Sequence, residues 1–158
     1  MAEESMPQIE ALYCAHAPDL LRYLQRNFGR SVSAEDLLQE TFVRWMAREE
    51  SAQRAESPRA FLFGIARHVG LTALRKARRH HTEPIGEVAA RPLVEQDPQL
   101  QQMCVAIAKL PDQIRETLEL RLREELSYEE IATVLGIPLG TVRSRLHTAL
   151  RMLRDTLT

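Results

Sequence analysis

Residues 127–154 decide the fold of this 158-residue chain, and they read SYEEIATVLGIPLGTVRSRLHTALRMLR. Ser127 and Glu130 have the spacing of a capping box, in which the serine hydroxyl accepts from the N3 amide and the glutamate reaches back to the N-cap amide. The short apolar helix that follows runs into Gly136, a residue that tolerates the positive φ of a sharp turn. Pro138 then starts a second helix, because proline is favoured in a first helical turn. The stretch therefore predicts a helix-turn-helix.

The second helix of this hairpin is expected to have one apolar and one polar face. The apolar stripe, expected to be buried, consists of Val142, Leu146, Ala149, Leu150 and Leu153. Residues 139–154 contain four arginines and no acid. Arginine can bind guanine edges or phosphates, and Ser and Thr can donate to phosphate oxygens, so this helix is a candidate for the major groove of DNA. A plain helical hairpin in a bundle is the alternative. The candidate DNA-contacting residues are Leu139, Gly140, Thr141, Arg143, Ser144, Arg145, His147, Thr148 and Arg151.

The composition of the whole chain also favours helix. Hydrophobic residues make up 44% and charged residues 27%, as in ordinary folded proteins, and Leu, Ala, Arg, Glu and Gln dominate. Alternating apolar and polar runs are too short for an all-β fold, and no stretch reaches the about 18 apolar residues of a membrane span. Cys14 and Cys104 lie far apart, without metal-ligand spacing, and the N-terminus lacks a secretory signal. We therefore expect a reduced, cytoplasmic protein that needs no metal or cofactor and does not insert into a membrane.

Prolines divide the chain in two. Residues 82–98 contain three prolines in seventeen positions, which breaks helical periodicity. We expect an all-α fold of two small helical domains, residues 1–81 and 99–158, joined by a flexible linker over residues 82–98. In the second domain, helices over residues 100–110 and 114–122 are expected to precede the helix-turn-helix.

Three helices are expected in the first domain. Apolar residues recur at helical spacing from Ile9 to Phe28, with a kink or break at Pro18. A second helix begins after Ser33, which is placed to cap it, and a third begins at Ser57 with a proline at its first helical position. The expected buried stripe of the second helix is Leu37, Leu38, Thr41, Phe42, Trp45 and Met46.

Positive charge is concentrated in the third of these helices. The chain has a net charge of −1, but residues 59–81 carry six basic side chains and no acidic one. Such a cluster favours a polyanionic partner, because neutralising phosphates is its usual use. A solvated helix face is the alternative.

Four segments resemble a known family when they are taken together. They are EDLLQETF (35–42), RAFLFGIAR (59–67), LSYEEIA (126–132) and GTVRSRL (140–146). In this order, with the linker in the middle, they resemble region 2 and region 4 of bacterial RNA polymerase sigma factors of the small extracytoplasmic-function class. The stretch SPRAFL (57–62) resembles the iron-starvation, or ferric-citrate, type within that class.

The resemblance implies a function and a set of contacts. It implies a specificity subunit that binds core RNA polymerase and promoter DNA, directs initiation, and has no catalytic residue of its own. Region 4 would bind the minus-thirty-five element through the second helix of the helix-turn-helix. The loop at residues 49–56 and the start of the third helix would bind the minus-ten element. Phe61, in that helix, is the leading candidate for stacking on an unstacked base. Core packing is the alternative for Phe61. Residues implied to dock on the β′ clamp helices are Asp36, Gln39, Glu40 and Val43. Residues implied to contact minus-ten DNA are Phe61, Ile65, Arg67, His68, Arg75, Lys76, Arg78 and Arg79. The β flap of the polymerase and an anti-sigma protein are the further implied partners.

Three other interpretations stay open from the sequence. A stand-alone helix-turn-helix regulator would bind a palindromic duplex without polymerase. A helical-bundle enzyme is the second, although the sequence offers no paired carboxylates, Cys/His dyad or glycine-rich phosphate loop for it. A degenerate sigma-like decoy in a partner switch is the third.

Overall fold

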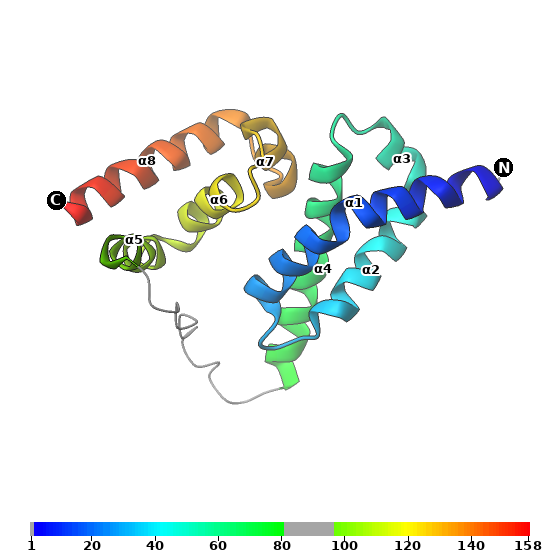
Figure 1. Ribbon diagram of the computed structural model, residues 1–158, viewed down its shortest axis with the longest axis horizontal. Helices are drawn as coiled ribbons and strands as arrows, with labels where there is room; N and C mark the ends of the chain where they lie inside the picture. Colours follow the sequence, from blue (N-terminus) through cyan, green and yellow to red (C-terminus); the bar gives the residue numbers. More distant parts are fainter. Residues whose placement is uncertain (1, 81–96) are drawn as a thin grey trace. The chain divides into compact units, whose positions relative to one another are not determined.

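The structure is a computed structural model that describes residues 2–80 and 97–158, and all regular structure in these ranges is α-helical (Figure 1). The chain divides into two compact units. Helices of the first unit are α1 (Ala2–Phe28), α2 (Ala34–Ala47), α3 (Glu49–Arg54) and α4 (Pro58–His80). The second unit is built from α5 (Pro98–Ala108), α6 (Asp112–Leu122), the part of α7 (Tyr128–Leu135) up to Ala132, and α8 (Leu139–Leu157). The expected all-α fold with two small helical units is confirmed.

The expected linker is only partly within the described residues. Residues 82–96 lie outside them. Asp97 and Pro98, also assigned to the linker, instead start α5: the Asp97 carboxylate accepts a hydrogen bond from the Gln99 amide at 3.0 Å, and Pro98 is the first helical residue.

Helices α2 and α4 begin where the sequence predicts. The Ser33 hydroxyl accepts from the Asp36 amide at 3.4 Å, and the Ser57 hydroxyl accepts from the Ala60 amide at 3.1 Å. Each serine satisfies an amide that has no partner within its own helix. These two caps fix the starts of the two helices that carry the predicted contacts of the first unit.

Helix α1 continues through Pro18, so the expected break there is wrong. Proline removes one helical hydrogen bond, but residues on both sides of it are held by packing. Ala17, Leu20 and Leu24 are buried, and α1 packs against both α2 and α4. Tertiary packing supplies most of the stability of such a helix, and it outweighs the lost bond.

Aromatic rings join the three long helices of the first unit. Tyr23 of α1 packs edge-on against Phe63 of α4, with 5.3 Å between ring centroids. The Phe28 ring lies directly over Gly70, where a β-carbon would come within 2.3 Å of the ring.

The predicted buried stripe of α2 is correct at five of its six residues. Met46 is 43% exposed, so its expected burial is wrong.

The helix-turn-helix forms as predicted. The Glu130 amide donates to the Ser127 hydroxyl at 3.1 Å, and the Ser127 amide donates to the Glu130 carboxylate at 3.0 Å, which completes the capping box. Gly136 ends α7 at a φ of 64°, in the left-handed region that favours glycine. The positive φ of Gly136 therefore lets the chain turn from the end of α7 to the start of α8.

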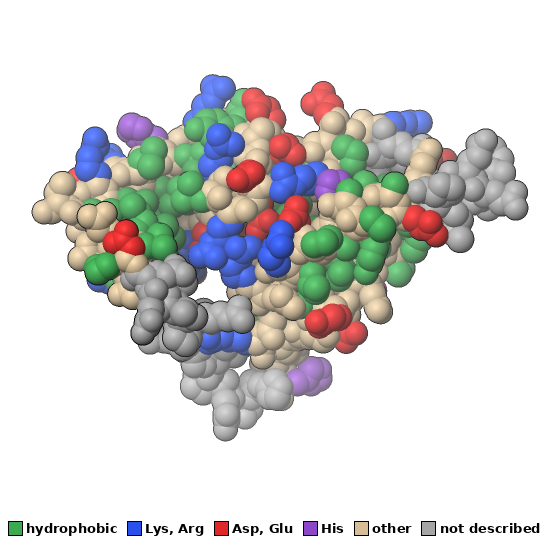
Figure 2. Space-filling model, in the orientation of Figure 1, with side chains coloured by type: hydrophobic (Ala, Val, Ile, Leu, Met, Phe, Trp, Pro, Cys, Tyr) green, Lys and Arg blue, Asp and Glu red, His purple; other side chains and the backbone are tan. Residues whose placement is uncertain are grey.

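The inner face of α8 is apolar, with one correction. Val142, Leu146, Ala149 and Leu153 are buried, whereas Leu150 is 62% exposed and its expected burial is wrong. At 3.6 residues per turn each i to i+4 step advances about 40° around the axis, so Leu150 has turned about 80° away from Val142. Leu100 and Met103 of α5 and Leu157 of α8 are exposed as well. Hydrophobic side chains gather over α5 and α8 (Figure 2).

Candidate functional site

The outward face of α2 is acidic and polar around one apolar side chain. Asp36, Gln39 and Glu40 are exposed, and Val43 is 54% exposed. Their spacing of three and four residues places them on one side of the helix. Arg44 donates to the Glu40 carboxylate at 2.8 Å at the edge of this face. Carboxylates repel phosphate, so this face suits a protein partner and not a nucleic acid.

Two exposed apolar residues, Tyr13 and Met46, are also found on α1 and α2, and burial had been predicted for Met46. Tyr13 of α1 is 44% exposed, and its ring centroid is 4.8 Å from that of Phe42. Met46, in the last turn of α2, is 43% exposed. Tyr13 was missed because it falls in the apolar periodicity of α1, and only the packing shows that it lies at the margin of the core.

The first half of α4 holds four of the predicted minus-ten residues at different depths. His68 is exposed, Phe61 and Arg67 are half-buried, and Ile65 is only 6% exposed. Ile65 therefore belongs to the core and supports this helix face from beneath. The predicted loop before α4 contains the short helix α3, which the sequence analysis missed.

The last turns of α4 form a basic surface. Arg75, Lys76, Arg78 and Arg79 are all exposed. Helix α4 contains no acidic residue along its length. The negative end of the helix dipole lies at the same end, so the cations also stabilise the helix that presents them.

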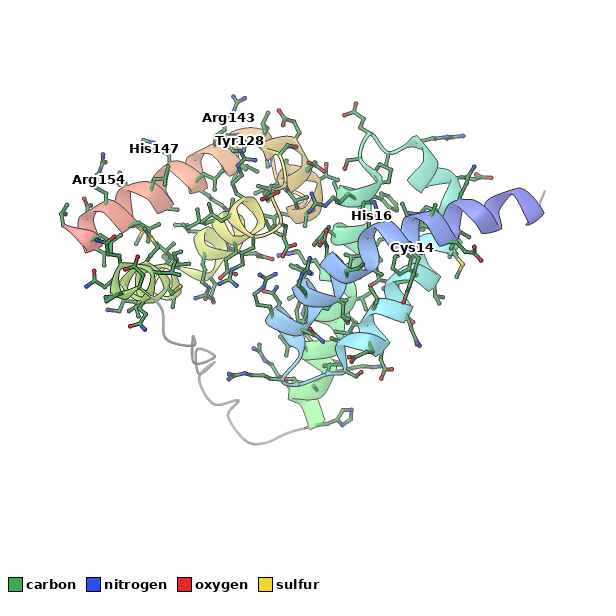
Figure 3. All side chains as sticks on the ribbon, in the orientation of Figure 1. Cys14, His16, Tyr128, Arg143, His147 and Arg154 are labelled. Atoms are coloured by element: carbon green, nitrogen blue, oxygen red, sulfur yellow. The ribbon has the colours of Figure 1, made fainter. Side chains whose placement is uncertain are left out.

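The outer face of α8 is basic and polar. Arg143, Ser144, His147 and Arg151 are exposed, and Gly140 is exposed at the start of the helix. Arg143, His147 and Arg154 project from the same side of α8 (Figure 3). The half-buried residues along its edges are Leu139, Thr141, Arg145 and Thr148. All nine predicted DNA-contacting residues are thus on the outer face or its margins.

Residues of α6 hold this helix-turn-helix in place. Gln113 accepts a hydrogen bond from the Arg145 guanidinium at 3.2 Å. Arg121 donates to the Leu126 carbonyl at 2.9 Å and lies 5.4 Å from the centroid of the Tyr128 ring. Sequence reasoning missed Gln113, because the pair is 32 positions apart and no local pattern marks it.

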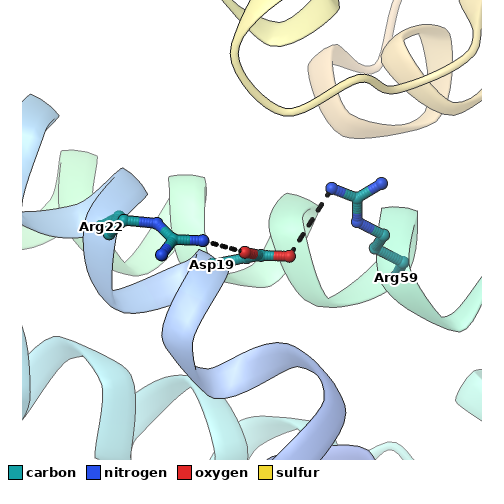
Figure 4. Close-up of polar contacts among 3 residues, drawn as sticks. All are labelled: Asp19, Arg22 and Arg59. Atoms are coloured by element: carbon teal, nitrogen blue, oxygen red, sulfur yellow. Dashed lines mark hydrogen bonds and ion pairs between the residues drawn. The ribbon is translucent and has the colours of Figure 1, made fainter.

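His16 and Cys14 do not form a metal site with other described residues. Cys14 is exposed, and no group of three potential ligands exists among the residues that the structure describes. Burial lowers the pKa of His16, the Arg59 guanidinium lowers it further, and Asp19 opposes both. Asp19 lies between Arg22 and Arg59 and pairs with both, at 3.8 Å to Arg59, which links α1 to α4 (Figure 4). None of the described helices combines the length and apolar content that crossing a bilayer requires.

Two family models match the two units. Sigma-70 region 2 matches residues 12–80, and Sigma-70, region 4 matches residues 106–155. The ECF RNA polymerase sigma factor SigL of Mycobacterium tuberculosis is 36% identical over 156 residues, which cover 94% of this chain and 88% of SigL. The RNA polymerase sigma factor YlaC of Bacillus subtilis is 33% identical over 159 residues, covering 95% of this chain and 92% of YlaC.

Solved structures give the same result. The chain is similar to the sigma factor RpoE of Bartonella quintana, solved in complex with the anti-sigma factor NepR, with a TM-score of 0.64, 28% identity, and coverage of 92% of this chain and 96% of RpoE. The fold is also that of CnrH, with a TM-score of 0.60, 24% identity, and coverage of 94% of this chain and 86% of CnrH. These relationships exclude the enzyme and the stand-alone regulator. The chain belongs to the extracytoplasmic-function sigma factors, the specificity subunits that bind core RNA polymerase and direct it to initiate transcription at promoters.

Proposed function

We propose that this sigma factor reads two promoter elements, the minus-thirty-five element with α8 and the minus-ten element with α4. The observation that carries the proposal is the outer face of α8, where Arg143, Ser144, His147 and Arg151 are exposed over a buried apolar stripe. A helix of this kind fits the major groove, in which arginine and hydroxyl groups can bind base edges and phosphates. Leu139, Gly140, Thr141, Arg145 and Thr148 are proposed as the margins of the same contact.

The first half of α4 is proposed to capture an unstacked base of the opened strand. Phe61 is half-buried, so this residue is not fully enclosed by the core. Stacking on an aromatic side chain stabilises an open strand by about 1–3 kcal/mol per base. Arg67 and His68 would contact the same strand, Ile65 would support the helix from the core, and the cations of the last turns would bind phosphates.

Phe61 can be tested on two templates. Phe61→Ala should reduce open-complex formation on duplex promoter DNA more than binding to a fork that is already melted, because only in the duplex must base capture offset the cost of opening base pairs. Phe61→Trp keeps the stacking surface and should retain activity. An equal loss of Phe61→Ala on both templates would argue against a role in melting.

The acidic face of α2 is proposed to dock on the clamp helices of the polymerase β′ subunit. Asp36, Gln39, Glu40 and Val43 are exposed there, and Tyr13 and Met46 would extend the apolar contact. Gln39→Arg places a positive charge on this acidic face and should weaken capture of core polymerase. Gln25→Arg is a matched control, because Gln25 is also exposed but belongs to α1. Equal capture by the two variants would refute this docking face.

A second polymerase contact is proposed on the hydrophobic surface of α5 and α8. Leu100, Met103, Leu150 and Leu157 are each between 38% and 62% exposed, and exposed apolar patches mark interaction sites more often than chance. We propose the β flap as its partner. Leu150→Glu should then weaken use of promoters that need the minus-thirty-five element, with binding to core through α2 retained.

We also propose an anti-sigma protein as a regulatory partner. The support is the similarity to RpoE, which was solved with the anti-sigma factor NepR. Regulation and transcription would take place in the cytoplasm, where core polymerase works.

The iron-starvation type is proposed from one stretch, SPRAFL at 57–62. Ser57 and Pro58 also cap and start α4, so part of the stretch has a structural use. Transcript levels of the target promoters should rise under iron limitation if the assignment is right. An unchanged level would remove this subtype and leave the sigma function intact.

The experiment that tests the proposal as a whole is transcription in vitro with purified core polymerase on a promoter library. We expect specific initiation and enrichment of two elements with a fixed spacing. Binding to core without initiation would identify a decoy instead. Initiation that does not depend on an upstream element would refute the role of α8.

A further inference from the structure

Arg145 of α8 is held by a residue outside the helix-turn-helix. Its guanidinium donates to the side-chain oxygen of Gln113, in the first turn of α6, across 3.2 Å. Helices α6 and α8 pack against each other, and Arg145 is half-buried at the margin of α8 whereas Arg143 and Ser144 are exposed. The bond therefore draws one arginine of the basic helix toward α6.

The partner of Arg145 is a neutral amide, whereas several other arginines of the chain pair with carboxylates. A carboxylate that pairs with an arginine neutralises its charge, so a DNA phosphate would have to compete with that carboxylate for the guanidinium. The side-chain amide of Gln113 fixes the direction of the guanidinium without neutralising it. Residues 139–154 contain no acid that could do so either. The arginines held by carboxylates in the described chain include Arg22 with Asp19, Arg44 with Glu40, and Arg115 with Asp112.

We propose that Gln113 is a positioning residue of the minus-thirty-five site, one that orients Arg145 toward a backbone phosphate at the edge of the groove. This rests on the proposed function, in which α8 contacts that element. A guanidinium has five N–H donors, and Gln113 uses one, so the others and the full charge remain for DNA. Arg145 lies at the margin of α8 and not at its outermost face, which favours a phosphate over a base edge. Phosphate contacts fix the register of a protein on duplex DNA.

Holoenzyme binding to duplex promoter DNA tests the proposal. The probe is a fragment selected with the unmodified holoenzyme, and its Kd is measured over a range of salt concentrations. Gln113→Ala should weaken binding about 2- to 10-fold, because Arg145 must then be ordered on binding. The slope of log K against log salt should not change, since the charge is kept. Arg145→Ala should weaken binding and make that slope shallower by about 0.9, the value for one phosphate contact.

Combination variants separate positioning from direct contact. Gln113→Ala should cause no further loss when it is added to Arg145→Ala, because residues that act through one contact are not additive. Gln113→Glu keeps the acceptor but adds a charge that pairs with Arg145, so it should make the salt slope shallower as Arg145→Ala does. Gln102→Ala is the control, since Gln102 is exposed on α5, and it should bind as the unmodified protein does.

Several results would overturn the proposal. If Gln113→Ala weakens binding equally in the Arg145→Ala background, Gln113 contacts DNA itself and does not position Arg145. If Arg145→Ala changes neither the affinity nor the slope of log K against log salt, Arg145 does not contact a phosphate. Both results leave the unmodified holoenzyme initiating at its promoter, whereas failure of the unmodified chain to initiate would refute the proposed function. Thermal unfolding followed by circular dichroism should be the same for all variants, and a lowered transition for Gln113→Ala would assign its effect to folding.

Discussion

Gly70 of α4 lies against the Phe28 ring of α1, so a single added methyl group would disturb the packing of these two helices. A β-carbon there would lie 2.3, 2.5 and 2.6 Å from three atoms of the Phe28 ring. Phe28 is itself only 7% exposed, so the ring has little room to move. We therefore expect Gly70→Ala to destabilise the first unit, although alanine is the better helix former.

Two opposing terms set the magnitude. Replacing glycine by alanine inside a helix is worth about 1 kcal/mol in favour of the folded state. Adding a methyl group to a packed core costs about 1–3 kcal/mol, and ordinary carbon contacts lie near 3.5–4 Å, so all three ring atoms are more than 0.8 Å too close. The contact should fall in the upper part of that range, which leaves a net loss of about 1–2 kcal/mol.

The assay uses the position of the only tryptophan. Trp45 is buried in α2, so its fluorescence during urea unfolding reports the first unit. Phe28→Leu makes room at the contact, and the cost of Gly70→Ala should shrink in that background. Gly140→Ala is the contrasting control, because no atom lies within 4 Å of a β-carbon there. Since Gly140 lies in the second unit, the unfolding of this variant is followed by circular dichroism. A Gly70→Ala variant as stable as the unmodified protein, or a cost of Gly70→Ala that is unchanged in the Phe28→Leu background, would refute the packing argument.

Three further predictions concern the second unit and pH. Glu125 has a φ of 53°, so Glu125→Gly should stabilise the protein by about 1 kcal/mol, seen as a higher midpoint in thermal unfolding followed by circular dichroism; an unchanged or lower midpoint would contradict this. Ser127→Ala removes the hydroxyl that accepts from the Glu130 amide and should cost about 1 kcal/mol in the same assay, whereas Ser127→Asp should largely preserve the cap. The lowered pKa of His16 means that the folded state holds this proton less tightly than the unfolded state, so its contribution to stability is complete above pH 6.5 and falls as the pH drops below that value. His16→Gln should therefore flatten the pH dependence of urea unfolding between about pH 7 and 5, and parallel curves for the two proteins would count against the assignment.

Local chemistry in the sequence predicts the helix boundaries well. Ser33, Ser57 and Ser127 each cap the helix that was expected to follow, and Gly136 has the positive φ that its turn requires. Caps and turns depend on residues within four positions of one another, so one sequence contains all the information they need. Helix α3 has no comparable capping residue or apolar periodicity in its sequence, EESAQR (49–54).

Burial is predicted less well at the edges of the apolar stripes. Met46 and Leu150 are apolar and close to the correct phase, yet both are exposed. Periodicity gives the direction of a side chain from its own helix, but burial also depends on how far the neighbouring helix extends, which is a tertiary property. Pro18 shows the same limit, because the packing of α1 outweighs its local preference.

The candidate site is predicted in the same partial way. The exposed residues of α2, the basic end of α4 and the outer face of α8 follow from the phase of each helix. Tyr13 and Gln113 do not, because each becomes notable only through a contact with another helix, Tyr13 with Phe42 and Gln113 with Arg145. Pairs of this kind, whose members lie on different helices, leave no periodic pattern in the sequence.

Charge explains how a chain of 158 residues with a net charge of −1 can bind both a large protein and DNA. The inner faces of α2, α4 and α8 are alike, since each is an apolar stripe that stabilises its own unit. The outer faces differ: α2 presents carboxylates around Val43, whereas α4 and α8 present arginines. Phosphates are repelled by the first and attracted by the others, so DNA does not compete with a protein for α2. Separation of charge by helix face, which the sum of charges conceals, would therefore give each partner its own surface under the proposed function.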